Sequence, residues 1–418
     1  MTGKHDAQVR PLEGVRVIDL SWVLAGPVAG RLLADAGAEV IKVESRKRLD
    51  NTRRGKPVPV APGVHEADSD PLDRVPLFHN LNAGKQSIAL DLGTPDGLAL
   101  LKRLLAISDV VLDNFAPGVM TRLGLGPEVL CAEFPQLVAI SLSGTGQTGP
   151  LADVPAYAPT VTSLAGLEDL VGYDGEGAEG ILGLNLADSF AGLVAFHAIL
   201  NALWSQRATG RGQFIDYSEM EGICTMLAMP LMDFELNGRV MAPTGNTEGQ
   251  AAPYGMFPVA GVDQWISLAI TNDDEWLAFC AATHRQAWCD DERFATVAGR
   301  TSLRLELEQA IAVYTRGQMA GELLARLPAA GVAAGPLHNF ADQLGDAHLR
   351  ARGLFHEIDI PDIGPHTIYG SPWRLSDTPT QSRSGAPKLG EHTTAILRGL
   401  LGIDAAEIAR LSAAGVLT

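Results

Sequence analysis

The chain has 418 residues, 46% of them hydrophobic, and a formal net charge of −17, so it is an acidic globular protein with room for two or three domains. Such a charge argues against nucleic acid or an anionic membrane as a partner. Segment 1–10 is polar and lacks the apolar core of a signal peptide, and no stretch approaches about 18 uninterrupted apolar residues. A cytoplasmic location is therefore expected, and four scattered cysteines predict reduced thiols and no metal site.

The N-terminal part of the chain alternates short apolar runs with helical patterns. Strands are predicted at 15–20, 39–44, 86–90, 110–112 and 137–142, and helices at 24–36, 95–107 and 117–123. This alternation predicts an α/β fold with a parallel sheet that helices cover on both faces. The first β–α–β unit places Glu44 like the ribose-binding acid of a dinucleotide site. However, the turn 21–27 lacks the Gly-x-Gly-x-x-Gly loop, so a standard NAD site is not expected.

Segment 46–76 is a long polar loop with a basic first part and an acidic later part. The basic side chains are Arg46, Lys47, Arg48, Arg53, Arg54 and Lys56. One interpretation is a solvated surface loop, because runs of charge usually face water. The other is a functional loop whose basic end faces phosphate groups. The residues alone leave both interpretations open.

Further along, helical patterns at 157–167 and 193–204 and a short strand at 214–217 lead to a long predicted helix at 220–236. Segments 254–260 and 265–269 flank a turn and predict a hairpin. Helical patterns then follow at 274–282, 303–314, 321–327, 394–401 and 405–412. We therefore expect a large Rossmann-like domain in 1–220, a linker helix in 221–237, a small α+β domain in 238–330, and a return to the large domain in 331–418.

Asp188 is the candidate catalytic residue. It is the only acid between Glu179 and Asp216, and small and apolar residues surround it. An isolated carboxylate in such surroundings is costly to desolvate, which is typical of a nucleophile or a proton carrier. Asp is also favoured as the N-cap of a helix, and an apolar helical run follows. On spacing alone, the two interpretations are equally good.

Several ordered motifs together resemble one known family. They are Gly14-Val-Arg-Val-Ile-Asp-Leu-Ser21, Ala25-Gly-Pro27, Gly37-Ala-Glu-Val-Ile-Lys-Val-Glu44, Asn82-Ala-Gly-Lys-Gln-Ser-Ile88, Asp113-Asn-Phe-Ala-Pro-Gly118, Leu186-Ala-Asp188, Thr209-Gly-Arg-Gly-Gln213 and Leu389-Gly-Glu-His-Thr393. In this order they resemble the class III coenzyme A transferases, the group that includes formyl-CoA transferase and the carnitine and bile-acid CoA transferases. The resemblance extends from about Leu12 to His392.

The resemblance implies that Asp188 is the nucleophilic carboxylate, and that acyl-CoA is a substrate rather than a permanently bound cofactor. It implies CoA contacts at Leu24, Ala25, Leu90, Asp91, Leu92, Gly93, Asn114, Phe115 and Arg122, with Tyr157 near the thioester. Two positions depart from formyl-CoA transferase. Its adenine-side arginine is Ser45 here, so Arg46 is expected to substitute, and the basic residue before its tyrosine is Pro155. The family also implies a homodimer in which two ring-like chains interlock.

The same family contains α-methylacyl-CoA racemases, which pair the catalytic Asp with a catalytic His. That His position aligns with Tyr157, and a phenol with a pKa of about 10 is a poor base at neutral pH. His197 lies in an apolar helical run and is interpreted as a core residue. We therefore expect transfer of CoA from a donor acyl-CoA to an acceptor carboxylic acid. Racemisation and non-catalytic CoA binding are the alternatives.

In the expected reaction, Asp188 forms a mixed anhydride and then an aspartyl-CoA thioester. The amides of 189–191 at the helix start are expected to stabilise its charge. The loop 245–249 is either a lid over the acyl group or a plain lead-in to the hairpin. Tyr157, Asn185 and this loop are expected to select the acyl group, whose identity the sequence leaves open.

Overall fold

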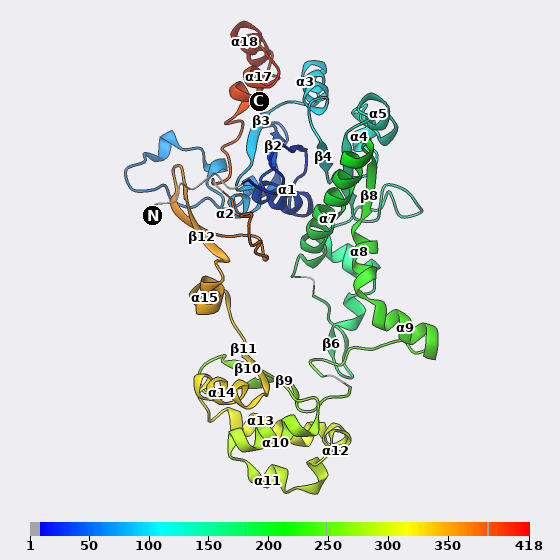
Figure 1. The fold of residues 1–418 in the computed structure, drawn as a ribbon, viewed down its shortest axis with the longest axis vertical. Coiled ribbons are helices and arrows are strands. Elements are labelled where there is room, and N and C mark those ends of the chain that lie inside the picture. The colour runs from blue at the N-terminus through cyan, green and yellow to red at the C-terminus, as the bar shows by residue number, and fades with distance from the viewer. Residues whose placement is uncertain (1–8, 182, 248, 383) are drawn as a thin grey trace. The chain divides into compact units, whose positions relative to one another are not determined.

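The computed structural model describes residues 9–181, 183–247, 249–382 and 384–418, and the chain divides into two compact units (Figure 1). The first unit comprises Met1–Leu167, Ile181–Leu236 and His348–Thr418, and the second comprises Glu168–Gly180 and Asn237–Ala347. Each unit is thus assembled from segments that are far apart in the sequence.

A parallel sheet forms the centre of the first unit (Figure 1). Its six strands lie in the order β3-β2-β1-β4-β5-β8, and every neighbouring pair is parallel. They are β1 (Arg16–Asp19), β2 (Glu39–Glu44), β3 (Gln86–Ala89), β4 (Val110–Asp113), β5 (Val138–Ser143) and β8 (Phe214–Ser218). Because β1 and β4 are neighbours in space but not in sequence, the strand order reverses between them. Ligands of open parallel sheets bind beyond the carboxyl ends of the strands at such a switch point.

Helices cover both faces of this sheet because consecutive strand residues point to opposite sides and both sets are apolar. Val17 of β1 belongs to one core cluster with α1 (Ala25–Asp35) and α7 (Leu186–Thr209). Its neighbour Ile18 belongs to the other, with α3 (Pro95–Leu105), α17 (Thr393–Gly399) and α18 (Ala405–Ala413). The prediction of an α/β fold with a parallel sheet is confirmed.

Two predictions about helix boundaries are wrong. α7 begins at Leu186 rather than at residue 193, so Asp188 lies inside it. The predicted single helix 220–236 is two helices, α8 (Glu219–Met226) and α9 (Ala228–Asn237), with Leu227 between them. The chain also forms an unpredicted hairpin of β12 (Phe355–Ile360) and β13 (Gly364–Tyr369). The shorter α-helices outside the second unit's core are α2 (Pro76–Asn82), α4 (Val119–Arg122), α5 (Pro127–Glu133), α6 (Ala158–Leu164) and α16 (Ala347–Ala351).

α7 is long and apolar enough, by length and composition, to cross a membrane, with a mean hydropathy of 1.5 over its most apolar window. It is instead a partly buried core helix of the first unit. Ala191, Ala195 and Ile199 lie fully buried in the cluster that also contains residues of α1 and the central strands. Its apolar character is therefore explained by packing against the sheet.

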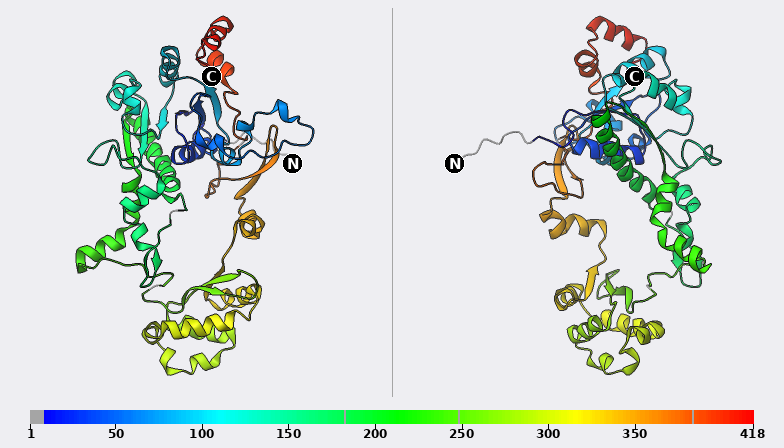
Figure 2. Two further views of the ribbon diagram at one scale, coloured as in Figure 1. Left: turned by 180° about the vertical axis from the view of Figure 1, so that it is seen from behind. Right: turned by 45° about the vertical axis from the view of Figure 1, so that its right-hand side comes forward.

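The second unit has its own core, built on an antiparallel sheet in the order β11-β10-β9. Its strands are labelled in Figure 1, and Figure 2 shows the same unit from two further directions. The strands are β9 (Tyr254–Pro258), β10 (Trp265–Ala269) and β11 (Ala333–Pro336), and the longer helices are α10 (Asp273–Thr283) and α13 (Arg304–Thr315). Trp276, Phe279 and Trp288 stack on one another in this core. The predicted hairpin is confirmed as the β9–β10 pair. The remaining elements are β6 (Gly172–Tyr173), β7 (Gly177–Ala178), α11 (Gln286–Cys289), α12 (Val297–Ser302), α14 (Ala320–Arg326) and α15 (Phe340–Gly345).

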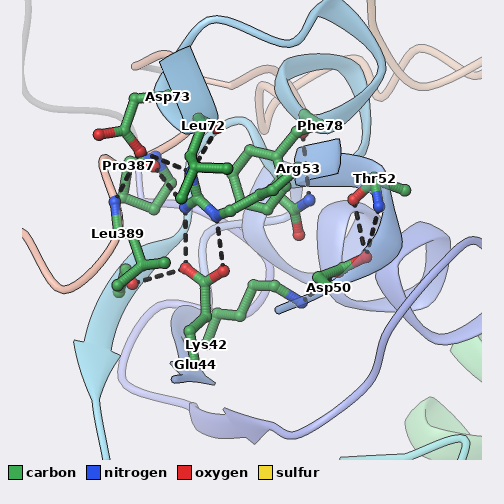
Figure 3. A network of polar contacts seen from close by, with 12 residues as sticks. Lys42, Glu44, Asp50, Thr52, Arg53, Leu72, Asp73, Phe78, Pro387 and Leu389 are labelled. Carbon is green, nitrogen blue, oxygen red and sulfur yellow. Dashed lines mark hydrogen bonds and ion pairs between the residues drawn. The ribbon is translucent and has the colours of Figure 1, made fainter. Parts of the chain in front are cut away.

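A buried arginine organises the long polar loop that follows β2 (Figure 3). The Arg53 guanidinium donates to both carboxylate oxygens of Glu44 at 2.7 and 2.9 Å and to Asp73 at 2.7 Å. It also donates to the carbonyl of Pro387 at 3.0 Å and lies 3.5 Å above the ring of Phe78. The side chain has no exposed surface. The buried guanidinium of Arg53 therefore connects β2, the polar loop and a C-terminal segment.

The acids around Arg53 extend this network into the motif at 389–393. Glu44 accepts a hydrogen bond from Ser87 Oγ at 2.7 Å, and Ser87 Oγ accepts one from the Gly390 amide at 2.9 Å. Asp73 accepts from the Leu389 amide at 2.9 Å (Figure 3). Two expectations are corrected by this arrangement: Glu44 is occupied by protein donors rather than placed for a ribose, and Arg53 is not available to a phosphate.

Replacing Arg53 with alanine should strongly destabilise the protein, because Glu44 and Asp73 would then be buried without their cation. Removing one partner of a buried ion pair costs about 3–5 kcal/mol. We expect a clearly lower midpoint of thermal or urea unfolding. Arg54→Ala is the matched control, since Arg54 is adjacent in sequence and exposed, and it should leave the midpoint nearly unchanged. Similar midpoints for the two variants would show that this network does not stabilise the fold.

Candidate active site

The turn that follows β1 is held by charged side chains that are buried at the carboxyl end of the sheet. Asp19 accepts hydrogen bonds from the amide of Ser21 at 2.9 Å and from its hydroxyl, and it pairs with Lys85 at 2.8 Å. Burial alone would raise the pKa of Asp19, but Lys85 and Lys42 outweigh it and hold that pKa below its ordinary value. Asp19 is therefore an ionised structural residue.

A second buried pair fixes the same turn from the other side. Lys42 pairs with Asp50 at 3.1 Å and donates to the carbonyl of Ser21 at 2.6 Å. Asp50 accepts from the amide of Val23 at 3.2 Å. Val23 has a φ of +64°, a strained conformation for a β-branched residue. The buried charges hold the backbone in this shape immediately before Leu24 and Ala25.

Asn114 links the ends of β1 and β4 at the switch point. Its side-chain oxygen accepts from the Trp22 amide at 2.7 Å, and its side-chain nitrogen donates to the Trp22 carbonyl at 2.7 Å. The ring of Phe115 meets the Trp22 ring edge-on, with centroids 5.7 Å apart. Arg48 lies 5.6 Å from the centroid of the Trp22 ring. The structure therefore brings Asn114 and Phe115 together beside Leu24, as expected, and adds Trp22 and Arg48, which the motif analysis had not selected.

The predicted contacts after β3 separate into buried and accessible groups. Leu90 is 1% exposed and packs in the core, so its side chain cannot reach a ligand at the surface. Asp91 pairs with Lys47 at 2.6 Å and accepts from the Gly93 amide at 2.9 Å. Leu92 is half-buried against the core, and Gly93 is exposed. The segment from Asp91 to Gly93 is therefore the accessible part of this predicted CoA contact, which stays a prediction.

Two of the predicted basic contacts are accessible. Arg46 is half-exposed and pairs with Asp70 at 2.6 Å, so a phosphate would have to replace that carboxylate. Burial tends to raise the pKa of Asp70, but a backbone donor and Arg46 hold it below its ordinary value. Arg122 is exposed on α4, close to Gly118. Phosphate binding by Arg46 and Arg122 stays a prediction.

Asp188 lies in the first turn of α7 and is not its N-cap. The N-cap is Asn185, whose side chain makes no capping hydrogen bond. The Ser189 amide donates to the Asn185 carbonyl at 3.2 Å, and the next amides lie inside the helix. The expectation that amides of 189–191 stabilise the Asp188 carboxylate is therefore wrong. Burial raises the pKa of Asp188 to about 6, with no other contribution resolved.

Close packing of α7 on α1 places Asp188 near the switch point. A Cβ added to Gly192 would lie 2.5 Å from Val28 and 2.8 Å from the Ala25 carbonyl, so only glycine allows this approach. Asp188 is four residues before Gly192, one helical turn away on the same face. The structure thus brings the candidate nucleophile beside the start of α1, where the predicted CoA contacts Leu24 and Ala25 lie.

Glu219 is a further site residue that the sequence analysis missed. It is the first residue of α8 and only 7% exposed. Burial, with the nearby charge of Asp188 in addition, raises its pKa to about 8. The hydroxyl of Tyr217 is buried and has no hydrogen-bond partner among the described residues, and burial, together with Glu219, raises the pKa of Tyr217 to about 12. Gly222 and Ile223 follow Glu219 by three and four residues, so the three residues lie on the same side of a helix, and all three are buried. This spacing was the sequence signal that could have predicted the burial of Glu219.

The other candidates near Asp188 are accessible. Tyr157 is 75% exposed and precedes α6, and Asn185 is exposed. His197 is exposed and contacts Asn201 at 3.0 Å, so its interpretation as a core residue is wrong. It lies about 13 Å along α7 from Asp188, given the helical rise per residue. The loop 245–249 includes residue 248, which lies outside the described residues, and its role as a lid stays a prediction.

A parallel sheet with a desolvated carboxylate beside its switch point defines an α/β protein with a candidate nucleophile at its ligand-binding edge. Residues 12–393 match the model of CoA-transferase family III, and the chain belongs to this family. It is therefore a CoA-transferase. Among the residues that the structure describes, no group of three or more His, Cys, Asp or Glu side chains could hold a metal ion.

Similar proteins match the chain over nearly its full length. It is 36% identical to a succinate–glutarate CoA-transferase of Agrobacterium fabrum, with 94% of this chain and 96% of that protein covered. It is 34% identical to a succinyl-CoA–D-citramalate CoA-transferase of Chloroflexus aurantiacus, with 98% of each covered. A crystal structure of a CAIB/BAIF family protein from Brucella suis superimposes with a TM-score of 0.83 at 36% identity, covering 94% of this chain and all of that chain.

Asp188→Asn should stabilise the protein at neutral pH. Because the folded-state pKa is raised to about 6, ionised Asp188 opposes folding progressively above its ordinary pKa of 3.8, and by a constant amount above about pH 6. Allowing for partial exposure, we expect a gain of about 1–2 kcal/mol in unfolding free energy at neutral pH. The gain should disappear as the pH falls towards about 4.

Thermal unfolding of both proteins across this pH range measures the effect. Asp153→Asn is the control, because Asp153 is exposed and should show no pH-dependent gain. A gain that stays constant down to acidic pH would argue that the ionisation of Asp188 is not its cause.

Proposed function

We propose that this CoA-transferase exchanges CoA between succinyl-CoA and a second dicarboxylic acid through an aspartyl-CoA thioester on Asp188. The observation that carries the proposal is the partly buried Asp188 carboxylate, whose pKa is raised by burial and which lies beside the start of α1. The named substrates of the two relatives above, succinate, glutarate and D-citramalate, support a short dicarboxylate. They are substrates of those proteins and motivate the choice of acids to test.

In the proposed reaction, an Asp188 oxygen attacks the thioester carbonyl of succinyl-CoA and the carbon–sulfur bond breaks. The products are a mixed anhydride and the CoA thiolate. The thiolate then attacks the aspartyl carbonyl, which releases succinate and forms the aspartyl-CoA thioester. The acceptor carboxylate attacks this thioester and repeats both steps in reverse, so acyl-CoA leaves and the Asp188 carboxylate is restored. The thioester energy is conserved at each step, provided that water is excluded.

The environment of Asp188 suits a nucleophile. With a pKa of about 6, it is ionised at neutral pH, while its carboxylate is less solvated than one at the surface. Its helical neighbours Ala187 and Gly192 are small and buried, and Gly192 lets α7 approach α1 closely beside it. A weakly solvated carboxylate needs less reorganisation of water when it attacks, which favours covalent catalysis over a purely structural role.

Transfer agrees better with the residues around Asp188 than racemisation. A racemase needs a second base on the opposite face of the α-carbon, and His197 is too far along α7 to serve. Tyr157 is exposed at the position where the racemases place their histidine. The matching relatives are named as CoA-transferases, which also favours transfer.

We propose that the CoA moiety binds along the carboxyl edge of the sheet, from the segment after β3 to the switch point. The Trp22 and Phe115 rings, which meet edge-on, offer an apolar surface to the CoA moiety. Arg48, beside Trp22, offers a positive charge to its phosphates, since no acidic partner contacts it among the described residues. Arg46, Asp91 to Gly93 and Arg122 extend this edge. Backbone groups of Leu24 and Ala25 lie at the end of the edge that is near Asp188.

Asp188→Ala and Asp188→Asn should abolish exchange between succinyl-CoA and glutarate, because each variant lacks the carboxylate that is proposed to form the covalent intermediate. Loss of a nucleophile typically lowers kcat by about 10⁴-fold or more. Chromatography of acyl-CoA products measures the exchange, with Asp153→Asn as the control expected to remain active. Addition of hydroxylamine during turnover should modify Asp188 in the wild type, as read by mass spectrometry. Retained exchange in either Asp188 variant would refute the proposed mechanism.

Asn114→Ala should weaken CoA binding, because the turn after β1 loses both of its side-chain hydrogen bonds to Trp22. We expect about a tenfold rise in Kd, equivalent to about 1.4 kcal/mol. Isothermal titration with free CoA measures this without catalysis. Asn51→Ala is the control, since Asn51 is exposed and should bind CoA as the wild type does. An unchanged Kd for Asn114→Ala would remove the switch-point turn from the CoA site.

A further inference from the structure

Asp188 does not lie alone: a second carboxyl group, Glu219, lies beside it in apolar surroundings. The first turn of α7 and the start of α8 meet α6 in a small hydrophobic cluster that includes Ala158, Ala187 and Ile223. Glu219 is 7% exposed. No donor contacts its carboxyl oxygens among the described residues. A carboxyl group that is largely buried and has no donor among the described residues is poorly stabilised in its charged form.

Burial disfavours the charged form of each carboxyl group, and the negative charge of Asp188 further opposes the ionisation of Glu219. Glu219 is the more buried of the two, and burial together with Asp188 raises its pKa to about 8. The other titratable group that faces it is Tyr217 from β8, which stays neutral in this range. α6 contributes no titratable side chain. At neutral pH, these pKa shifts favour a negative charge on Asp188 and a proton on Glu219.

We propose that Glu219 binds the acceptor acid, by donating a hydrogen bond from its protonated carboxyl group to the carboxylate that exchanges at Asp188. This inference rests on the proposed function. While Asp188 is a CoA thioester it has no charge, and the incoming acceptor carboxylate brings a negative charge to the same place. A protonated Glu219 would donate a hydrogen bond to the incoming carboxylate and stabilise its negative charge, whereas an ionised Glu219 would repel that carboxylate.

The proposal predicts how the pH dependence of the reaction should change on substitution. As the pH rises through about 8, Glu219 loses its proton and the kcat/KM for the acceptor acid should fall. Glu219→Gln keeps the size of the side chain and an N–H donor but cannot ionise. It should remain active and lose this alkaline fall. Glu219→Ala removes the donor and should raise the KM for the acceptor about tenfold, with little change in the KM for succinyl-CoA.

The experiment compares wild type, Glu219→Gln, Glu219→Ala and the control Glu221→Gln in succinyl-CoA–glutarate exchange across neutral and alkaline pH. Glu221 is on the same helix but exposed, so its variant should keep the wild-type pH profile. An alkaline fall that persists in Glu219→Gln, or an acceptor KM that is unchanged in Glu219→Ala, overturns the proposal. In either case the exchange catalysed by the wild type leaves the function of Asp188 standing.

A readout without turnover separates failure of this inference from failure of the proposed function. Infrared difference spectra between the wild type and Glu219→Gln at neutral pH should contain the carbonyl band of a protonated carboxyl group. Absence of that band overturns the proposal, whatever the activity. Its presence in a wild type that exchanges no acid would overturn the assigned reaction, and with it acceptor binding by Glu219. Retained CoA binding and an unchanged thermal midpoint in Glu219→Gln confirm that the variant is folded.

Discussion

The structure depends on ion pairs that neutralise buried charges at the carboxyl end of the parallel sheet. Most of the buried charged side chains there have a partner of opposite charge. Arg53 lies between Glu44 and Asp73, and Lys85 pairs with Asp19. Such pairs are expensive to desolvate, yet breaking one is more expensive still, so they commit the backbone to one arrangement. Asp188 and Glu219 differ because no cation pairs with them among the described residues, and burial raises the pKa of each instead.

The paired charges position the ligand edge although they do not contact a ligand themselves. Asp19, Lys42 and Asp50 hold the turn after β1, including the left-handed backbone at Val23. That turn presents Trp22 to Asn114 and leads directly into α1. α1 in turn packs so closely on α7 at Gly192 that the position of Asp188 is fixed. A chain of rigid contacts thus runs from buried ion pairs to the candidate nucleophile, which is the support that precise active-site geometry needs.

The sequence predicted what depends on local pattern. β2 was predicted with its bounds, 39–44, because the β-branched residues Val40, Ile41 and Val43 are concentrated there after the turn at Gly37. The start of α7 was missed because Gly183 and Asn185 resemble a loop. Arg53 resembled a phosphate ligand because a run of basic residues does not show that Glu44, Asp73 and Pro387 converge on one of them. Asp188 was selected because the sequence itself shows that no other acid lies near it along the chain. The burial of Glu219, in contrast, depends on how α6, α7 and α8 pack together in three dimensions.

The pairing of Asp188 with Glu219 has a consequence for the whole proposed cycle. Apart from the far carboxylate of each dicarboxylic substrate, the reacting groups carry one negative charge at each proposed stage: on Asp188 before attack, on the CoA thiolate beside the anhydride, and on the acceptor carboxylate beside the thioester. A proton that stays on Glu219 keeps this total constant, so the surrounding dipoles need little rearrangement between steps. A second ionised carboxylate would double the charge in a poorly solvated space and favour a substrate without charge. In this proposal, the largely buried, protonated Glu219 is therefore the feature that matches the site to an anionic acceptor.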